Sequence, residues 1–181
     1  DTAVYSFDDL YDNFTTAFEQ TNFDDFKPKS ALILGLGLGS IPYILETKYG
    51  LKPHYTAVEL DEEVIYLAEK YRLSTLSAPV QCFAADAEIF VSICSDVFDL
   101  IVIDIFVDDQ IPEPFLEPEF LTQIVRLLDK QGMLMFNHMA MTAEQKNRVD
   151  SYIEQVMRPI FPTCTYIATR NNRILVNSSQ F

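Results

Sequence analysis

The amino-acid sequence predicts an α/β fold, a doubly wound and mostly parallel sheet of seven strands that ends in an antiparallel hairpin. Two observations support this prediction. Short apolar runs alternate five times with helix-forming stretches, which favours parallel strands joined by right-handed crossovers. The last two strand-like runs are separated only by a short turn, so they are expected to pair antiparallel. We expect a helical segment over residues 1–28 and the α/β domain over residues 29–181.

The N-terminal segment carries apolar side chains at helical spacing. They recur every three to four residues, which indicates an amphipathic helix over residues 7–20. Pro28 then interrupts the chain. The apolar positions are Phe7, Leu10, Tyr11, Phe14 and Phe18.

The five parallel strands are short apolar runs. The fourth is apolar throughout, which is typical of a strand buried on both faces. In order, the predicted strands cover residues 31–34, 55–59, 80–84, 100–103 and 133–136.

The helices are marked by their first residues. Asp61 and Asp86 are predicted N-caps, because an Asp side chain accepts hydrogen bonds from the free N–H groups of a first helical turn. Pro42 suits a first turn, where no backbone donor is needed. The predicted helices cover residues 40–48, 61–71, 86–93, 117–128 and 142–157. Gln131 and Gly132 are predicted to end the fourth of them.

The closing hairpin is predicted over residues 165–169 and 173–176. Asn171 and Asn172 lie between these runs, and both tolerate the positive φ angles of a tight turn.

The formal net charge is −14. A surface this acidic repels nucleic-acid phosphates and anionic lipid heads, so neither nucleic acid nor a membrane is an expected partner. A cationic small-molecule substrate is favoured, although the charge could also serve solubility alone. The sequence leaves a monomer and a homodimer open.

Cys82, Cys94 and Cys164 are scattered and form no CxxC pair. They predict neither a disulfide framework nor a metal site, and reduced thiols favour a cytoplasmic location. The first seven residues lack the basic start and apolar stretch of a signal peptide, and no apolar run approaches the roughly 20 residues of a membrane span.

Glycines follow the first predicted strand. Gly35, Gly37 and Gly39 would permit a tight turn and let a ligand approach the backbone, next to the positive end of the following helix. A dinucleotide fold would require glycine at position 40, where this chain has Ser40. The pattern therefore favours a nucleoside-binding turn over a dinucleotide site, and a turn without any ligand is the alternative.

Carboxylates follow the next three strands. Glu59 can accept hydrogen bonds from both hydroxyls of a ribose, or it can be a solvated loop charge. Asp86 can accept from an adenine amino group while Ala87 offers a backbone N–H, and a plain helix cap is the alternative. Asp104 would lie beside the reactive end of a ligand, where it could hold an ammonium group or accept a proton, and the alternative is a strand-end Asp that accepts hydrogen bonds from loop N–H groups.

These segments resemble the motifs of class I S-adenosylmethionine-dependent methyltransferases, and they are closer to the spermidine synthase branch. The similar stretches are ILGLGLGS at residues 33–40, AVELDEEVI at 57–65, AADAEIFV at 84–91 and FDLIVID at 98–104. The resemblance implies a Rossmann-like methyltransferase fold that binds S-adenosylmethionine or its decarboxylated form. It assigns cofactor binding to Gly35, Gly37, Gly39, Glu59, Leu60, Asp86, Ala87 and Asp104, with Asp104 as the catalytic residue.

The sequence departs from that branch after the fourth strand. Spermidine synthases carry a second Asp three residues after the strand-end Asp, where this chain has Val107, and Asp108 comes one residue late. Methyl transfer to a small acceptor, with an amine as one option, is therefore the first expectation. Aminopropyl transfer from the decarboxylated cofactor is the second, and a non-catalytic nucleoside-binding domain is the third. His138 either acts as a base or bonds a loop carbonyl.

Overall fold

A computed structural model describes residues 12–178 of the chain. Its sheet has seven strands in the order β3-β2-β1-β4-β5-β7-β6. The first five are parallel, and β7 pairs antiparallel with both β5 and β6. The strands are β1 (Ser30–Leu34), β2 (His54–Glu59), β3 (Val80–Ala84), β4 (Phe98–Ile103), β5 (Leu128–Met139), β6 (Thr165–Ala168) and β7 (Asn172–Val176).

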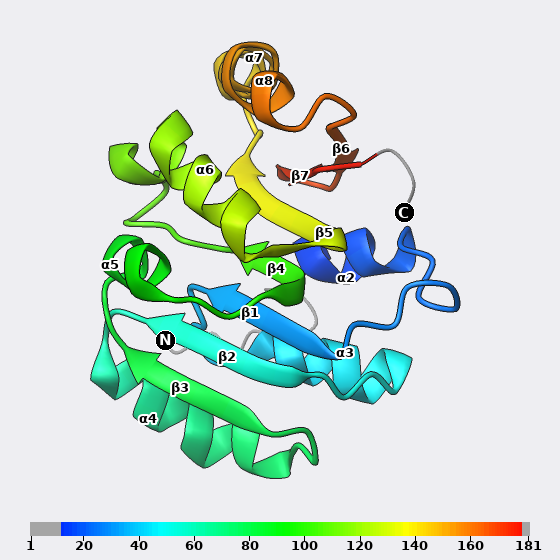
Figure 1. The fold of residues 1–181 in the computed structure, drawn as a ribbon, viewed down its shortest axis with the longest axis vertical. Coiled ribbons are helices and arrows are strands. Elements are labelled where there is room, and N and C mark those ends of the chain that lie inside the picture. Colours follow the sequence, from blue (N-terminus) through cyan, green and yellow to red (C-terminus); the bar gives the residue numbers. More distant parts are fainter. Residues whose placement is uncertain (1–11, 179–181) are drawn as a thin grey trace, which may run out of the picture.

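Helices cover both faces of the sheet (Figure 1). Apolar side chains of α2, α3 and α4 share one core with the sheet, and those of α5, α6 and α7 share the other. The helices are α2 (Asp12–Glu19), α3 (Ser40–Tyr49), α4 (Glu62–Tyr71), α5 (Ala87–Ile93), α6 (Pro118–Leu127), α7 (Ala143–Tyr152) and α8 (Arg158–Ile160), with short turns η1 (Leu73–Thr75), η2 (Glu113–Leu116) and η3 (Ile153–Met157). The doubly wound fold predicted from the sequence is confirmed.

Helix α2 packs on the sheet through the aromatic positions that predicted it. Phe14 and Phe18 are almost completely buried, and their rings lie 5.8 Å apart. The earlier part of the predicted helix, from Phe7 to Tyr11, lies outside the described residues. The domain boundary at residue 28 stays a prediction.

Two predictions for the C-terminal half were wrong in detail. Strand β5 begins at Leu128, directly after α6, so Gly132 lies inside the strand and does not end the helix. Its register against β4 shifts between Phe98 and Leu100, which accommodates the additional residues. The predicted helix over residues 142–157 starts with a capping box at Thr142 and Gln145, but its last five residues form a π-helical turn, η3.

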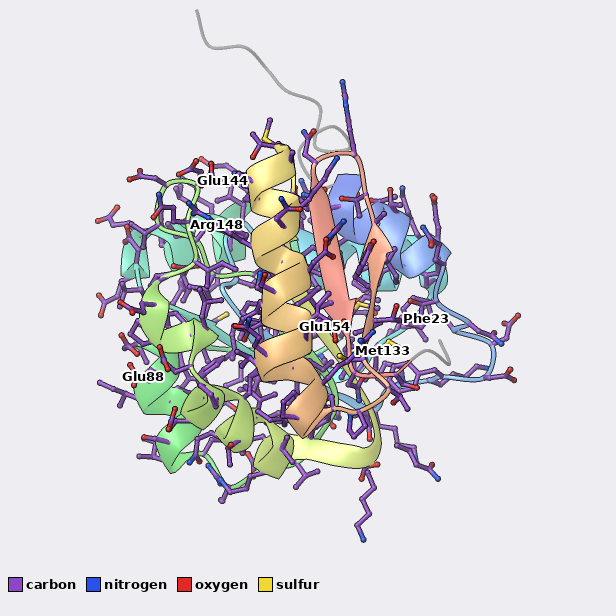
Figure 2. All side chains as sticks on the ribbon, turned by 90° about the horizontal axis from the view of Figure 1, so that it is seen from above. Phe23, Glu88, Met133, Glu144, Arg148 and Glu154 are labelled. Carbon is purple, nitrogen blue, oxygen red and sulfur yellow. The ribbon has the colours of Figure 1, made fainter. Side chains whose placement is uncertain are left out.

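The hairpin turn also differs from expectation. Within the described residues, the only non-glycine with positive φ is Asp108 (φ 57°), so neither Asn171 nor Asn172 adopts it. Asn172 is instead the first residue of β7, and Thr169 closes the turn by donating its backbone N–H to the Asn172 carbonyl at 3.0 Å. Figure 2 shows α7 and its continuation beside this hairpin.

Candidate active site at the carboxyl edge of the sheet

A cleft of about 360 Å³ lies at the carboxyl ends of the four strands β1 to β4. Parallel strands that end at the same edge bring distant sequence segments together there. Six of the eight residues predicted to bind the cofactor line this cleft. They are Gly35, Glu59, Leu60, Asp86, Ala87 and Asp104.

The glycine turn after β1 has two different structural requirements. Gly35 has φ 87°, and a Cβ there would lie 2.2 Å from the Asp104 carbonyl oxygen. Gly39 has φ 77° and precedes α3, and a Cβ there would lie 2.7 Å from the Leu73 side chain. Only Gly35 lines the cleft, whereas Gly37 and Gly39 do not. Glycine is therefore required at positions 35 and 39 in part because neighbouring loops and side chains leave no room for a Cβ.

Glu59 joins the first two loops of the edge. Its Oε2 accepts from the Gly37 backbone N–H and its Oε1 accepts from the Leu60 N–H, both at 2.9 Å. A carboxylate offers about four acceptor positions. Oε1 also accepts a longer hydrogen bond from the Asp61 N–H at 3.4 Å. The side chain is thus fixed in the cleft and retains capacity for a ribose hydroxyl.

Asp86 is the N-cap of α5. Its Oδ1 accepts from the backbone N–H groups of Glu88 at 2.8 Å and Ile89 at 3.2 Å. Ala87 is the first residue of that helix, where a backbone N–H has no intrahelical partner. Asp61 caps α4 in the same way, through the Glu63 N–H at 2.8 Å. Both predicted caps are confirmed, and Asp86 with Ala87 still offers an acceptor and a donor to a ligand.

Asp104 follows β4 and is held at the back of the cleft. Its backbone N–H donates to the Leu34 carbonyl at 2.8 Å, and its Oδ1 accepts from Asn137 Nδ2 at 2.9 Å. Burial raises the pKa of the Asp104 carboxyl to about 6, and the Asn137 hydrogen bond acts in the opposite direction. A carboxylate with this pKa is charged at neutral pH and can accept a proton.

The loop after Asp104 presents no second carboxylate to the cleft. Val107 lines it, whereas Asp108 and Asp109 do not. The backbone groups of Val107 and Gln110 bond each other at 2.9 and 3.1 Å, which closes a tight turn around the two exposed acids.

The described charged side chains that line the cleft are all negative. Among the described residues that line it, five are acidic and none is Lys, Arg or His. The five are Glu59, Asp61, Asp86, Glu88 and Asp104. Such an arrangement favours a positively charged ligand.

Two amides behind Asp104 were missed by the sequence reasoning. Asn137 and Asn172 are both buried, and Asn172 Nδ2 donates to Asn137 Oδ1 at 2.8 Å. An Asn within an apolar strand was the available signal, but its partner depends on how β5 pairs with β7.

His138 lies on the opposite face of β5 and lines a separate hollow with Tyr152. Its ring packs 4.4 Å from Phe136 and 5.0 Å from Tyr152, and its Nε2 has no hydrogen-bond partner. Burial lowers the pKa of His138 to about 3. Neither the role of base in the cleft nor the expected bond from Nε2 to a loop carbonyl is supported.

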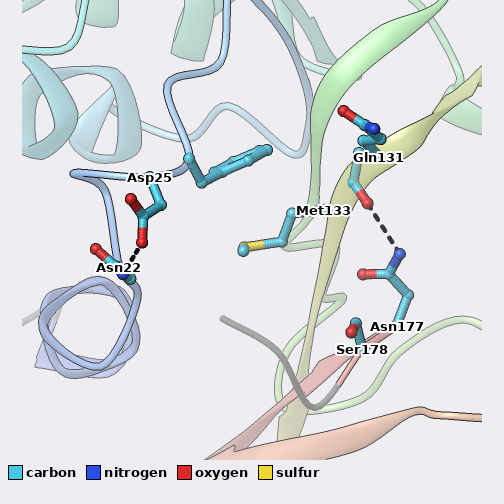
Figure 3. A pocket seen from close by; sticks show the side chains of 8 residues that line it. Asn22, Asp25, Gln131, Met133, Asn177 and Ser178 are labelled. Atoms are coloured by element: carbon cyan, nitrogen blue, oxygen red, sulfur yellow. Dashed lines mark hydrogen bonds between the residues drawn. The ribbon is translucent and has the colours of Figure 1, made fainter.

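A further hollow of about 480 Å³ lies at the other end of the sheet (Figure 3). Asn22, Asp25 and Met133 are among its lining residues, and none of the predicted site residues is. It therefore has no part in the site described above.

No helix within residues 12–178 is long and apolar enough to cross a membrane.

Comparisons with known proteins agree with this fold. The family model described as "Spermine/spermidine synthase domain" matches residues 18–176. A polyamine aminopropyltransferase of Vibrio vulnificus (strain CMCP6) is 33% identical over 114 residues, which is 61% of this chain and 38% of that protein. The chain thus spans well under half the length of this curated relative.

Two solved structures share the fold. Human methyltransferase-like protein 13, in complex with SAH, superposes with a TM-score of 0.72 at 20% identity, over 91% of this chain and 79% of that chain. A probable spermidine synthase from Corynebacterium glutamicum ATCC 13032 gives a TM-score of 0.71 at 23% identity, over 82% and 55%.

Proposed function

Since this chain belongs to the spermine/spermidine synthase domain family, a family of transferases with the methyltransferase fold, we propose that it transfers an aminopropyl group from decarboxylated S-adenosylmethionine to an amine. This proposal reverses the order expected from the sequence, which favoured methyl transfer. The relatedness to a polyamine aminopropyltransferase supports the change.

The observation that carries the proposal is the cleft of five acids without a lining cation. S-adenosylmethionine has a sulfonium, an ammonium and a carboxylate, whereas its decarboxylated form keeps only the two cations. A carboxylate about 6 Å from one acidic side chain would be disfavoured by about 3 kcal/mol at an effective dielectric constant of about 20. The cleft therefore favours the decarboxylated nucleoside.

The residues of the cleft fit the parts of that nucleoside. We assign the ribose hydroxyls to Glu59 and the adenine to Asp86 and Ala87, with Leu60 beside the ring. The backbone at Gly35, the one glycine of the turn that lines the cleft, would lie along the tail that carries the sulfur. These assignments rest on the acceptor capacity that Glu59 retains beside its three backbone hydrogen bonds and on the free N–H at the start of α5.

Asp104 is the catalytic residue of the proposal. A bound sulfonium would supply an electrophilic carbon and its own leaving group. The attacking amine must lose a proton as its new N–C bond forms and the C–S bond breaks, with the electron pair leaving on sulfur. Asp104 orients the amine and accepts that proton, which a buried carboxylate with a pKa of about 6 can do near neutral pH.

The test compares both nucleosides on the same protein. Isothermal titration with S-adenosylmethionine and with its decarboxylated form should give at least about tenfold tighter binding of the latter, equal to 1.4 kcal/mol. Incubation with putrescine should then yield spermidine by mass spectrometry. Tighter binding of S-adenosylmethionine would overturn the proposal.

Methyl transfer is the second candidate, and Val107 favours it. The position where spermidine synthases carry a second Asp is apolar and lines the cleft. The fold itself is compatible with either reaction, as the likeness to human methyltransferase-like protein 13 illustrates. Tight binding of either nucleoside without turnover across a panel of amines would instead indicate a non-catalytic binding domain.

The acceptor we propose is a small polycationic amine, in keeping with the net charge of −14. Cys82, Cys94 and Cys164 are all free thiols. Free thiols support a cytoplasmic location, the one expected from the sequence.

A further inference from the structure

A chain of side-chain hydrogen bonds runs from Asp104 into the C-terminal hairpin. Asn137 Nδ2 donates to Asp104 Oδ1 at 2.9 Å, and Asn172 Nδ2 donates to Asn137 Oδ1 at 2.8 Å. Both Asn side chains are only 4% exposed, so water does not compete for these groups. In the β5–β7 ladder, Asn172 pairs with Met139, two residues from Asn137, which places both amides on one face of the sheet.

The chain continues beyond the sheet. The Asn172 backbone N–H donates to Thr169 Oγ1 at 3.2 Å, and the Thr169 hydroxyl lies 2.7 Å from Asn13 Oδ1 on α2. Helix α2, the hairpin turn and the end of β5 are therefore joined by polar contacts that end on Asp104.

Asn172 determines which end of the Asn137 amide faces Asp104. A carboxamide has a donor end and an acceptor end. Because the oxygen of Asn137 is occupied by Asn172, its NH₂ group faces the carboxylate. Without Asn172, the amide could rotate and turn its oxygen toward Asp104, an arrangement that disfavours the charged carboxylate.

We propose that Asn172, acting through Asn137, is a positioning residue that keeps the Asp104 carboxylate charged and presents its Oδ2 oxygen to the amine. This inference rests on the proposed function, because it concerns the same carboxylate. Asp104 has no lining cation to stabilise its charge, and the titratable groups that line the same cleft, Glu59, Asp61, Asp86 and Glu88, are all acidic. The charge of Asp104 is thus stabilised by a hydrogen bond from a neutral amide, Asn137, which Asn172 holds in place. Thr169 and Asn13 fix the far end of the chain.

The first measurement needs no activity. Protein labelled with ¹³C at the Asp carboxyls is titrated without nucleoside, and Asp104→Asn identifies the Asp104 signal. We expect Asn172→Ala and Asn137→Ala to move the Asp104 titration to higher pH, because each removes a hydrogen bond, direct or relayed, that favours the charged form.

Asn177 provides a matched control at the other end of the same strand pair. Its side chain accepts from the Leu134 N–H and donates to the Gly132 carbonyl, both at 3.0 Å. Asn177→Ala also removes two hydrogen bonds between β5 and the end of β7, but it should leave the Asp104 titration unchanged. Thr169→Val is a milder second variant if Asn172→Ala does not fold, and it should shift the titration in the same direction.

The second measurement uses turnover. Asn172→Ala should lower kcat about tenfold, because the charge-assisted hydrogen bond from Asn137 to Asp104 is lost when the Asn137 amide turns. Nucleoside Kd should change little, and the acidic limb of the pH–rate profile should move to higher pH. An Asp104 titration in Asn172→Ala that matches wild type would overturn the inference, whatever the reaction. A shifted titration in a protein that transfers no aminopropyl group would retain the positioning role and overturn only the proposed function.

Discussion

Asp104 is a partly buried carboxylate in a cleft whose described lining holds no cation. An uncompensated buried charge is costly, and such costs concentrate at functional sites. Two consequences for this single residue can be measured separately, one in catalysis and one in stability.

In catalysis, Asp104→Asn should lower kcat at least about a hundredfold, the usual contribution of a general base. The Asn oxygen can still accept from Asn137, so the local packing is retained. Nucleoside Kd should stay within a few-fold of wild type in isothermal titration. Unchanged turnover would remove Asp104 from the reaction.

In stability, the same variant should gain. The pKa of Asp104 is raised from 3.8 to about 6 in the folded protein, so the folded state binds this proton more tightly than the unfolded state does. Stability from this group is complete below pH 4 and is lost as the pH rises through 6, by about 3 kcal/mol for about two pH units. Urea unfolding should show Asp104→Asn more stable than wild type at pH 8, with the difference shrinking toward pH 4. A difference independent of pH would contradict this reading.

At the scale of the element, Asp86 combines a helix cap with a proposed ligand contact, and substitutions can separate them. Asp86→Ala should lose about 1 kcal/mol of stability and weaken nucleoside binding. Asp86→Ser keeps a capping oxygen, so it should weaken binding with little loss of stability. Asp61→Ala, which removes the equivalent cap of α4, should lower thermal stability alone. Equal nucleoside Kd values in the three variants and wild type would exclude Asp86 from the binding site.

Gly35, in the turn after β1, and Gly50, at the C-terminal end of α3, allow a matched pair of glycine substitutions. Gly50 has φ 67° and nothing within 4 Å of an added Cβ, whereas a Cβ at Gly35 would meet the Asp104 carbonyl oxygen at 2.2 Å. Gly50→Ala should lower the free energy of unfolding by about 1–2 kcal/mol, the cost of a left-handed backbone conformation for a residue with a Cβ. Gly35→Ala should cost clearly more and displace the loop that carries Asp104, which chemical denaturation and nucleoside titration would detect. Equal losses of stability in the two variants would show that the loop carrying Asp104 can move to accommodate a Cβ at Gly35.

Element boundaries were predictable from the sequence where one local signal dominated. The apolar runs of β1 to β4 and the Asp caps of α4 and α5 depend on nearby residues only. Strand β5 was predicted too short because Leu128 pairs with Phe98 across a register shift, which no local pattern reveals. The π-turn at η3 and the hairpin turn were missed because packing and the Thr169 hydrogen bonds decide them.

At the scale of the whole molecule, the net charge of −14 should act on a cationic acceptor over a distance. The KM for putrescine should rise several-fold between about 0.05 and 0.5 M salt, because the Debye length falls below about 10 Å above 0.1 M. Binding of uncharged 5′-methylthioadenosine, followed by isothermal titration, should be nearly insensitive to salt. A salt-independent KM would mean that only short-range contacts recognise the amine.

The location of the site followed from topology, because parallel strands end at one edge and the sequence places Glu59, Asp86 and Asp104 there. The hydrogen bonds that link Asp104 to Asn137 and Asn172 could not be predicted from the topology. They need β7 to lie beside β5 in one register, so that residues 35 positions apart meet. Side-chain networks between strands distant in sequence are properties of the assembled sheet.

Consecutive residues of β5 have opposite surroundings, since Asn137 touches Asp104 and His138 packs beside Tyr152. Inserting or deleting one residue ahead of them in this strand would exchange the two faces. After a deletion, the His138 imidazole would stand behind Asp104 and the Asn137 amide would enter the aromatic layer. After an insertion, the Phe136 ring would stand behind Asp104 instead. We therefore expect homologous sequences to change length in the loops that flank β5, while the spacing between Gly132 and Asn137 remains constant.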